Sequence, residues 1–187
     1  MHLQILVASS LILAGAAASA APAVDLRGVW LVEDQTGEIE IENCTGLLWG
    51  IVVWERTPGR DTENPDPALR GRSTLGIPIL LGMRPVTEPH AEGPQTIWRG
   101  QIYNSRNGKT YDANIKPVDA DTLHLEGCVL GGLFCGGQNW TRVKSPAATP
   151  PAATPAAATP AAAAPPATAR LAGEVCSRVS DLARRTH

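Results

Sequence analysis

The chain has 187 residues, with 16 Lys and Arg against 18 Asp and Glu, so its formal net charge is −2. Charges of both signs are mixed along the chain, which excludes the concentrated basic face of a nucleic-acid-binding protein. Between two compositionally biased ends, residues 24–144 are enough for one domain.

The first 20 residues are typical of a removable signal peptide. Residues 3–14 form an apolar stretch that is too short to cross a bilayer but suits the core of a signal peptide. The small residues at 18–20 predict cleavage after Ala20. Because no Lys or Arg precedes the apolar stretch, an uncleaved N-terminal anchor is the alternative. We expect a periplasmic or secreted protein that is not an integral membrane protein after cleavage.

The first part of the domain shows two contrasting strand patterns. Residues 38–42 alternate between Glu and Ile, so we expect Ile39 and Ile41 to face the core and the three carboxylates to face water. The alternative is that this acidic row binds a ligand. Residues 47–54 follow a turn and are apolar on both faces, which predicts that both faces are covered, one of them by a lumen or a loop.

Later strands follow at short spacing. Asn107 and Gly108 predict a hairpin turn, because these residues readily take positive φ. With a weaker one at 77–83, the predicted strands number about eight: 28–33, 38–42, 47–54, 77–83, 96–103, 109–116, 122–128 and 138–143. Such strands predict an all-β sandwich or up-and-down barrel. The Pro-rich segments 57–72 and 84–94 are predicted to be long loops, which are often functional in compact β domains.

The C-terminal part has a different character. Residues 146–169 contain only Ala, Pro and Thr, a composition that cannot bury a core, so residues 145–169 are predicted to be a disordered linker. Residues 170–187 are expected to include a short amphipathic helix, with Leu171, Val175 and Leu182 on one side. An isolated helix of this length is marginal in water. We therefore expect it to dock on a partner or, through Cys176, on its own domain; a frayed tail is the alternative.

Four cysteines are present: Cys44, Cys128, Cys135 and Cys176. In an exported chain we expect disulfides, and four cysteines allow three pairings. The chain has no C-x-x-C and no H-x-x-x-H spacing, so we expect no metal site and no cofactor. The Gly-rich segment 131–137 lacks the Lys of a phosphate-binding loop. It is predicted to form a tight hairpin held by a Cys128–Cys135 or a Cys44–Cys135 bridge.

Several stretches resemble known families. Gly28 and Trp30 are similar to the G-x-W of lipocalin-like barrels, and the resemblance assigns to Arg142 the Arg that packs across this Trp. More specifically, residues 24–143 resemble the bacterial domain of unknown function family 2147. The matching stretches are GLLWGIVVW (46–54), NPDPALR (64–70), LGIPIL (75–80), WRGQIY (98–103), GKTY (108–111), GC (127–128) and QNWTR (138–142).

This resemblance implies a secreted, up-and-down, lipocalin-like β-barrel of about eight strands, without an established activity. Family members are expected to carry Cys where this chain has Trp49. The departure implies that the pairing of the cysteines is rearranged here, with Cys176 as a candidate for recruitment.

The segment 61–70 is the strongest candidate for a functional loop, since it gathers Asp61, Asn64, Asp66 and Arg70. Its carboxylates could bind a hard cation such as Ca²⁺ or, with Arg70, serve an enzyme. The structural alternative, which we favour, is that Asn64 and Asp66 make local turns and Arg70 bonds back to a carboxylate. The chain has no G-x-S-x-G and no other catalytic constellation, so we do not expect an enzyme.

A barrel of about eight strands has an interior just large enough for packed side chains or for one small ligand. The binding interpretation places aromatic residues around a pocket for a partly apolar ligand: Trp49, Trp54, Trp98, Tyr103 and Tyr111. The structural interpretation has the same Trp residues fill the barrel, while Trp30 and Trp140 seal its closed end.

By analogy of fold alone, we favour a non-enzymatic periplasmic protein that binds a small, partly apolar ligand or an envelope component. The alternative is a protein-interaction or stress-related envelope module that uses the 57–72 loop and the C-terminal helix.

Overall fold

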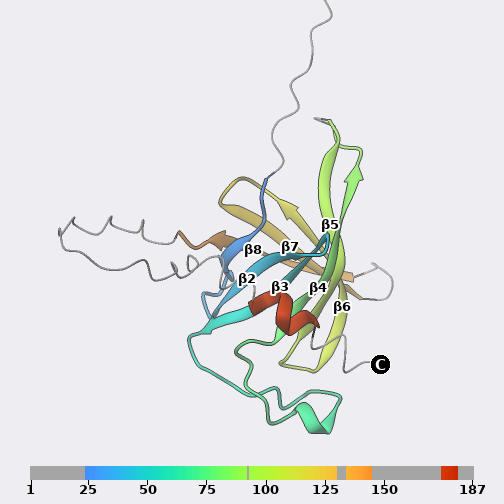
Figure 1. Ribbon diagram of the computed structural model, residues 1–187. Coiled ribbons are helices and arrows are strands. Elements are labelled where there is room, and N and C mark those ends of the chain that lie inside the picture. Colours follow the sequence, from blue (N-terminus) through green and yellow to red (C-terminus); the bar gives the residue numbers. More distant parts are fainter. Residues whose placement is uncertain (1–23, 92, 130–133, 145–173, 181–187) are drawn as a thin grey trace, which may run out of the picture.

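The computed structural model describes residues 24–91, 93–129, 134–144 and 174–180. Eight antiparallel strands close into a barrel in chain order, with β1 also pairing with β8 (Figure 1). The strands are β1 (Gly28–Leu31), β2 (Gly37–Cys44), β3 (Leu47–Glu55), β4 (Pro78–Glu88), β5 (Gln95–Asn104), β6 (Lys109–Pro117), β7 (Thr122–Val129) and β8 (Phe134–Arg142). The prediction of an up-and-down barrel of about eight strands is therefore confirmed, and a sandwich is excluded.

One end of the barrel is closed by the N-terminal segment and the last strand. Trp30 is fully buried and donates its indole N–H to the carbonyl of Leu26 at 2.9 Å. The Arg142 guanidinium lies 4.2 Å from the centroid of the Trp30 ring, a cation–π contact. Arg142 also donates to the carbonyls of Arg27 at 2.7 Å and Asp25 at 2.6 Å. These contacts hold the first and last strands together beneath the core.

The expected loop at 84–94 is shorter than the sequence indicates, because β4 continues to Glu88. Beyond Met83, β4 no longer pairs with β3 and pairs only with β5 in the described structure. Figure 1 shows this hairpin, in green, projecting beyond the barrel. A strand with one unpaired edge tolerates Pro85, since the missing N–H can lie on that edge. The prolines of this segment therefore mark an edge and not a loop.

A short helix at residues 174–180 lies on the outer face of β2 and β3, shown in red in Figure 1. Val175 is fully buried and clusters with Cys44 and Ile51. A disulfide joins Cys44 to Cys176. The helix therefore docks on its own barrel, and it covers the second face of the apolar strand β3. The signal peptide at 1–20 and the linker at 145–169 lie outside the described residues.

The expectation that all three carboxylates of the acidic row face water is wrong for Glu40. Its side chain is on the outer face, opposite Ile51 in the β2–β3 ladder, and the residue is only 3 % exposed. Within the described structure its Oε2 has no hydrogen-bond partner. Burial, and then the neighbouring Glu42 carboxylate, raise the pKa of Glu40 to about 7. The helix at 174–180 covers Ile51 on the same face. The strand face that was expected to be solvated is therefore buried at this point.

Breaking the Cys44–Cys176 disulfide is expected to release the helix from the barrel. Cys176→Ser removes the link, and the bridge between residues this distant in sequence should contribute about 2–4 kcal/mol to docking. Amide hydrogen exchange of residues 174–180 should become much faster, and the emission of Trp49, which packs on this cluster, should shift to longer wavelength. The Cys128→Ser/Cys135→Ser variant is the control and should leave both signals unchanged. Equal protection of the helix in Cys176→Ser and in the wild type would contradict the docking role of the bridge.

Candidate ligand-binding cavity

The barrel contains a cavity of about 760 Å³ that opens at the end opposite Trp30. Trp140 is the deepest lining residue of β8, 1 % exposed, and forms the floor. Aliphatic side chains from strands around the barrel line the walls: Ile39, Val52, Ile79, Ile102 and Leu125. The inner part of the cavity is therefore largely apolar, although the Gln138 side chain also lines it.

Polar side chains gather at the open end of the cavity. Asp34 and Thr36 come from the β1–β2 connection, Asn104 from the end of β5, and Ser105 and Arg106 from the β5–β6 turn. Asp34 and Arg106 form an ion pair at 3.6 Å across the mouth. An apolar interior with a small number of polar groups at its rim is the usual form of a small-molecule site.

The space in the cavity depends on two glycines that face each other. Gly127 of β7 pairs with Gly136 of β8, in line with the inward pairs Leu125–Gln138 and Leu123–Trp140. Both glycines line the cavity. A Cβ added at Gly136 would have no neighbour within 4 Å, so the backbone does not require glycine for packing there. The wall is open because side chains are missing from it.

Of the five aromatic residues predicted to bind a ligand, Tyr103 and Tyr111 line the cavity. Trp49 packs on the outside, in the cluster with the C-terminal helix. Trp98 packs against the main core, away from the described lining of the cavity. The Tyr111 hydroxyl accepts a hydrogen bond from the Asn107 amide at 2.7 Å.

Trp54 lies outside the barrel and is 42 % exposed. The β2–β3 register shifts between Glu38 and Ile39, which leaves Val53 unpaired as a β-bulge. A bulge reverses the inward and outward alternation of the residues that follow. It therefore turns Trp54 outward and directs Glu55 into the cavity mouth.

Asp61 is the centre of a buried hydrogen-bond network that joins the β3–β4 loop to the cavity wall. Its side chain is fully buried. It accepts hydrogen bonds from the Tyr103 hydroxyl at 2.6 Å, from the Asn64 amide at 2.7 Å and from the Arg72 guanidinium at 2.8 and 3.0 Å. Asn64 also donates to the Tyr103 oxygen at 3.1 Å. Since Tyr103 lines the cavity, this network fixes the loop beside the mouth.

These contacts shift the two acids of the network in opposite directions. Burial raises the pKa of Asp61, but the hydrogen bonds from Tyr103, Asn64 and Arg72 more than offset this and hold its pKa below the usual range. Burial, with the hydrogen bond to the Asp61 carboxylate, raises the pKa of Tyr103 to about 12. Asp61 is therefore ionised, and its buried side chain is not accessible to a substrate. Both of its oxygens accept hydrogen bonds from protein donors, and no cation is needed to satisfy them.

The rest of the loop makes local turns. The Asn64 side chain accepts from the backbone N–H of Asp66 at 2.9 Å, and the Asp66 side chain accepts from that of Ala68 at 2.9 Å, where a short 3₁₀ helix (Pro67–Leu69) begins. Arg70 donates to the carbonyl of Asn64 at 2.8 Å. The carboxylate of the network is bonded by Arg72, a residue that sequence reasoning did not single out. Asp61 and Arg72 are brought together by the Asp61 N–H to Arg72 carbonyl bond at 3.1 Å, which the spacing did not reveal.

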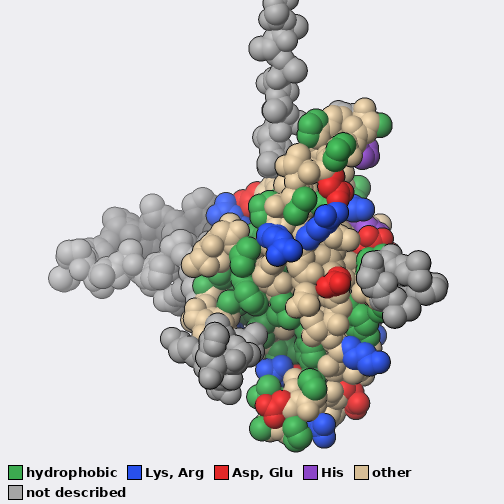
Figure 2. All heavy atoms as spheres, turned by 90° about the vertical axis from the view of Figure 1, so that its right-hand side faces the viewer, with side chains coloured by type: hydrophobic (Ala, Val, Ile, Leu, Met, Phe, Trp, Pro, Cys, Tyr) green, Lys and Arg blue, Asp and Glu red, His purple; other side chains and the backbone are tan. Residues whose placement is uncertain are grey.

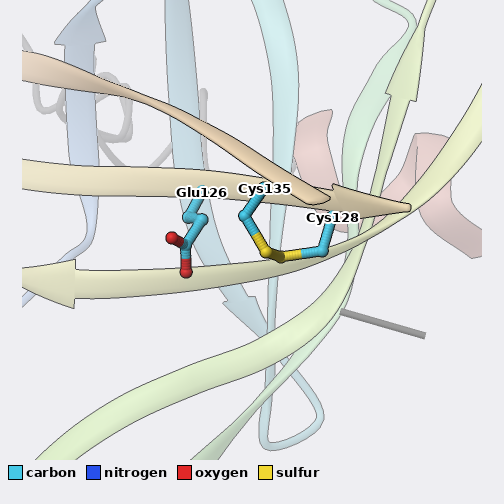
Figure 3. A group of neighbouring side chains, drawn as sticks. All are labelled: Glu126, Cys128 and Cys135. Carbon is cyan, nitrogen blue, oxygen red and sulfur yellow. A yellow bond between two sulfur atoms is a disulfide. The ribbon is translucent and has the colours of Figure 1, made fainter. Parts of the chain in front are cut away.

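Glu126, Cys128 and Cys135 lie close together on the β7–β8 hairpin (Figure 3). Three such side chains could hold a metal ion if the cysteines were thiolates. Their sulfurs are instead joined to each other in a disulfide, as one of the predicted pairings has it. With the Cys44–Cys176 bond, all four cysteines are paired.

The outer surface is mixed in character. Figure 2 shows basic and acidic side chains interspersed over one face of the molecule. Among the described helical residues, none form a helix long and apolar enough to cross a membrane.

Several cavity residues were not predicted as ligand contacts, although the alternation of the strands could have found them. Leu123 and Leu125 lie on the inner face of β7. The next position on that face, two residues further along β7, is Gly127, and its cross-strand partner is Gly136. Because glycine adds nothing to an apolar alternation pattern, neither Gly127 nor Gly136 was predicted to line a cavity.

Comparisons with known proteins agree with this geometry. Residues 28–142 match the family model described as "Uncharacterized protein conserved in bacteria (DUF2147)". No curated protein matches the chain by sequence. Among solved structures, the chain is similar to protein HP1028 from the human pathogen Helicobacter pylori, whose title says that it belongs to the lipocalin family. The TM-score is 0.56 and the identity 21 %, over 65 % of this chain and 85 % of the other. This likeness supports a lipocalin-like fold, and the family match covers every strand of the barrel: the chain belongs to the DUF2147 family of uncharacterised bacterial proteins.

Proposed function

We propose that the protein is a non-enzymatic binding protein of the bacterial envelope that holds one small, partly apolar ligand in the barrel cavity. The observation that carries the proposal is the open wall at Gly127 and Gly136, above an apolar floor and below a polar rim. A volume of about 760 Å³ lies within the range of roughly 300–1,000 Å³ that ligand pockets occupy. The fold alone would not support this, because lipocalin-like barrels can also be filled by side chains.

A periplasmic or secreted location belongs to the same proposal. Its support is the signal-like N-terminal sequence together with two disulfides, which persist in oxidising compartments. The ligand is accordingly one that is found in, or passes through, the cell envelope.

Filling the cavity wall is expected to abolish binding without unfolding the barrel. Gly136→Leu places an isobutyl group in space that is empty around the Cβ position, so it should occupy the cavity at little cost in stability. Titration with the neutral fluorophore N-phenyl-1-naphthylamine should give one saturable site in the wild type, weakened at least about tenfold in Gly136→Leu, since the ligand loses its van der Waals contacts.

Gly71→Leu is the matched control, because its Cβ position is also open and it lies on the β3–β4 loop outside the described cavity lining. It should bind the fluorophore like the wild type. If all three proteins bind it equally, or none binds it, the cavity is not a ligand site.

A further inference from the structure

A second pocket, which we call the rim pocket, adjoins the mouth of the cavity. It has a volume of about 400 Å³ and lies between the β3–β4 loop and the β5–β6 turn. Thr36, Glu55, Ser105 and Arg106 line both the rim pocket and the cavity. The two spaces therefore share an edge, and one ligand can occupy both.

The rim pocket differs from the cavity in the chemistry of its walls. None of its described lining residues is aliphatic or aromatic. Hydroxyl groups come from Thr36, Thr57, Thr62, Thr74 and Ser105. Three guanidinium groups (Arg56, Arg60 and Arg106) face two carboxylates (Glu55 and Glu63), with Gly59 completing the described wall. A ligand group bound here must be polar.

The charged groups of the rim pocket are unequally engaged. Glu55 accepts a short hydrogen bond from the buried Thr74 hydroxyl at 2.6 Å. Arg60 uses one terminal N–H to bond the carbonyl of Gly71, which leaves the other side of its guanidinium available. Arg56 has no ion pair among the described residues, and Arg106 meets Asp34 only at 3.6 Å. Glu63 also has no ion pair among the described residues, so its carboxylate and the second oxygen of Glu55 remain as acceptors. The N–H groups of three guanidiniums still outnumber these acceptors.

Guanidinium groups and hydroxyls are the donors that bind phosphate and carboxylate oxygens, and the planar fork of Arg matches them in bidentate geometry. An amphiphile with its apolar body in the cavity would place its head at the shared edge. The polar pocket at that edge and the apolar cavity beneath it therefore match the two ends of a single molecule.

We propose that the cavity and the rim pocket together bind an anionic amphiphile, whose phosphate or carboxylate head lies against Arg56, Arg60 and Arg106. This rests on the proposed function, because the apolar end requires the cavity. It adds the chemical class of the ligand and a second site that selects it.

The test is displacement of N-phenyl-1-naphthylamine from the full chain by four amphiphiles of equal length, each below its critical micelle concentration: dodecyl phosphate, dodecanoate, dodecanol and dodecyltrimethylammonium. At low ionic strength at least one of the two anions should bind about tenfold more tightly than the alcohol, as expected for charge-assisted hydrogen bonds. The cation should bind no better than the alcohol. The preference should shrink as salt is added, because the arginines are exposed. Which anion binds more tightly identifies the head as phosphate or carboxylate.

The Arg56→Gln/Arg60→Gln variant should reduce the ratio of anion to alcohol affinity to within about twofold, since the main donors are gone. Arg84→Gln removes the same kind of charge from a position of β4 that is not among the described lining residues of either pocket, and it should keep the full ratio. Binding of the fluorophore without any preference for the anions, or a preference that survives in the double variant, would overturn the proposed head site while leaving the proposed function standing. Failure of the fluorophore to bind the wild type at all would overturn both.

Discussion

Replacing Asp61 by alanine is expected to lower the free energy of unfolding by about 3–5 kcal/mol, the range seen when one partner of a buried ion pair is removed. The carboxylate is fully buried and receives donors from Tyr103, Asn64 and Arg72. Without it, three donors lose their acceptor and the Arg72 charge is left without its counter-ion. The loop should detach from the cavity wall, so fluorophore binding should weaken as well.

Urea unfolding monitored by tryptophan emission measures this effect. Asp66→Ala is the matched control: it removes a carboxylate from the same loop, but an exposed one whose contact is a single 3₁₀-helix cap, worth about 1 kcal/mol. The account of the network fails if the two variants are destabilised equally.

The Asp61 network also has a defined pH dependence. Because the folded pKa of Asp61 lies below its unfolded value of 3.8, the stabilisation is complete above pH 3.8 and is lost as the pH falls through the folded pKa. The Asp61→Ala variant should lack this acid-sensitive part of the stability curve.

Glu40 should produce the opposite dependence. Its carboxyl has a pKa of about 7 in the folded protein against 4.5 for the free group, so folding takes up a proton between these values. Stability is then greatest below pH 4.5, falls as the pH rises to about 7 and levels off above it. The difference corresponds to about 3 kcal/mol. Burial raises the pKa of Glu42 too, which adds a slope of the same sign.

Glu40→Gln is expected to remove most of this slope, because the amide cannot ionise. The measurement is the urea midpoint between pH 4.5 and 8, with Glu38→Gln as control on the same face of the same strand. The control should retain the slope of the wild type. Because Glu40 lies on the face that carries the helix at 174–180, helix protection in hydrogen exchange should decline over the same pH range. Identical slopes in the wild type and Glu40→Gln would show that Glu40 is solvated.

The strands could be predicted from the sequence because their evidence is local: alternation identifies strands such as residues 38–42, and Asn107 and Gly108 mark a hairpin. The strand pattern left both a sandwich and a barrel open, and the choice of the barrel rested on the resemblance to lipocalin-like sequences. The burial of Glu40 could not be predicted in the same way. The residues that cover this face lie more than 130 positions away, on a helix that depends on the Cys44–Cys176 bond.

The candidate site was predicted less well than the fold, for similar physical reasons. A single bulge at Val53 exchanges the expected positions of Trp54 and Glu55, and nothing in the local pattern announces it. Arg70 was expected to bond a carboxylate because the acidic residues are close to it in sequence. The loop instead folds back so that Arg72, and not Arg70, donates to the Asp61 carboxylate. The cavity itself is created by glycines, which composition does not mark as binding residues.

The alternative of an interaction module that uses the C-terminal helix has less support. The apolar residues Val175 and Val179 of the described helix are both buried, so in this conformation the helix does not present them to a partner. Release by reduction of Cys44–Cys176 would be required first.

Native mass spectrometry of the full-length gene product, purified from the cell envelope without detergent, tests the central claim most directly. We expect the mature chain to begin at Ala21 and to carry one small molecule in stoichiometric amount, and we expect Gly136→Leu prepared in the same way to carry none. A wild-type protein that emerges unliganded and also fails to bind N-phenyl-1-naphthylamine would contradict the claim that this barrel holds a ligand in its cavity.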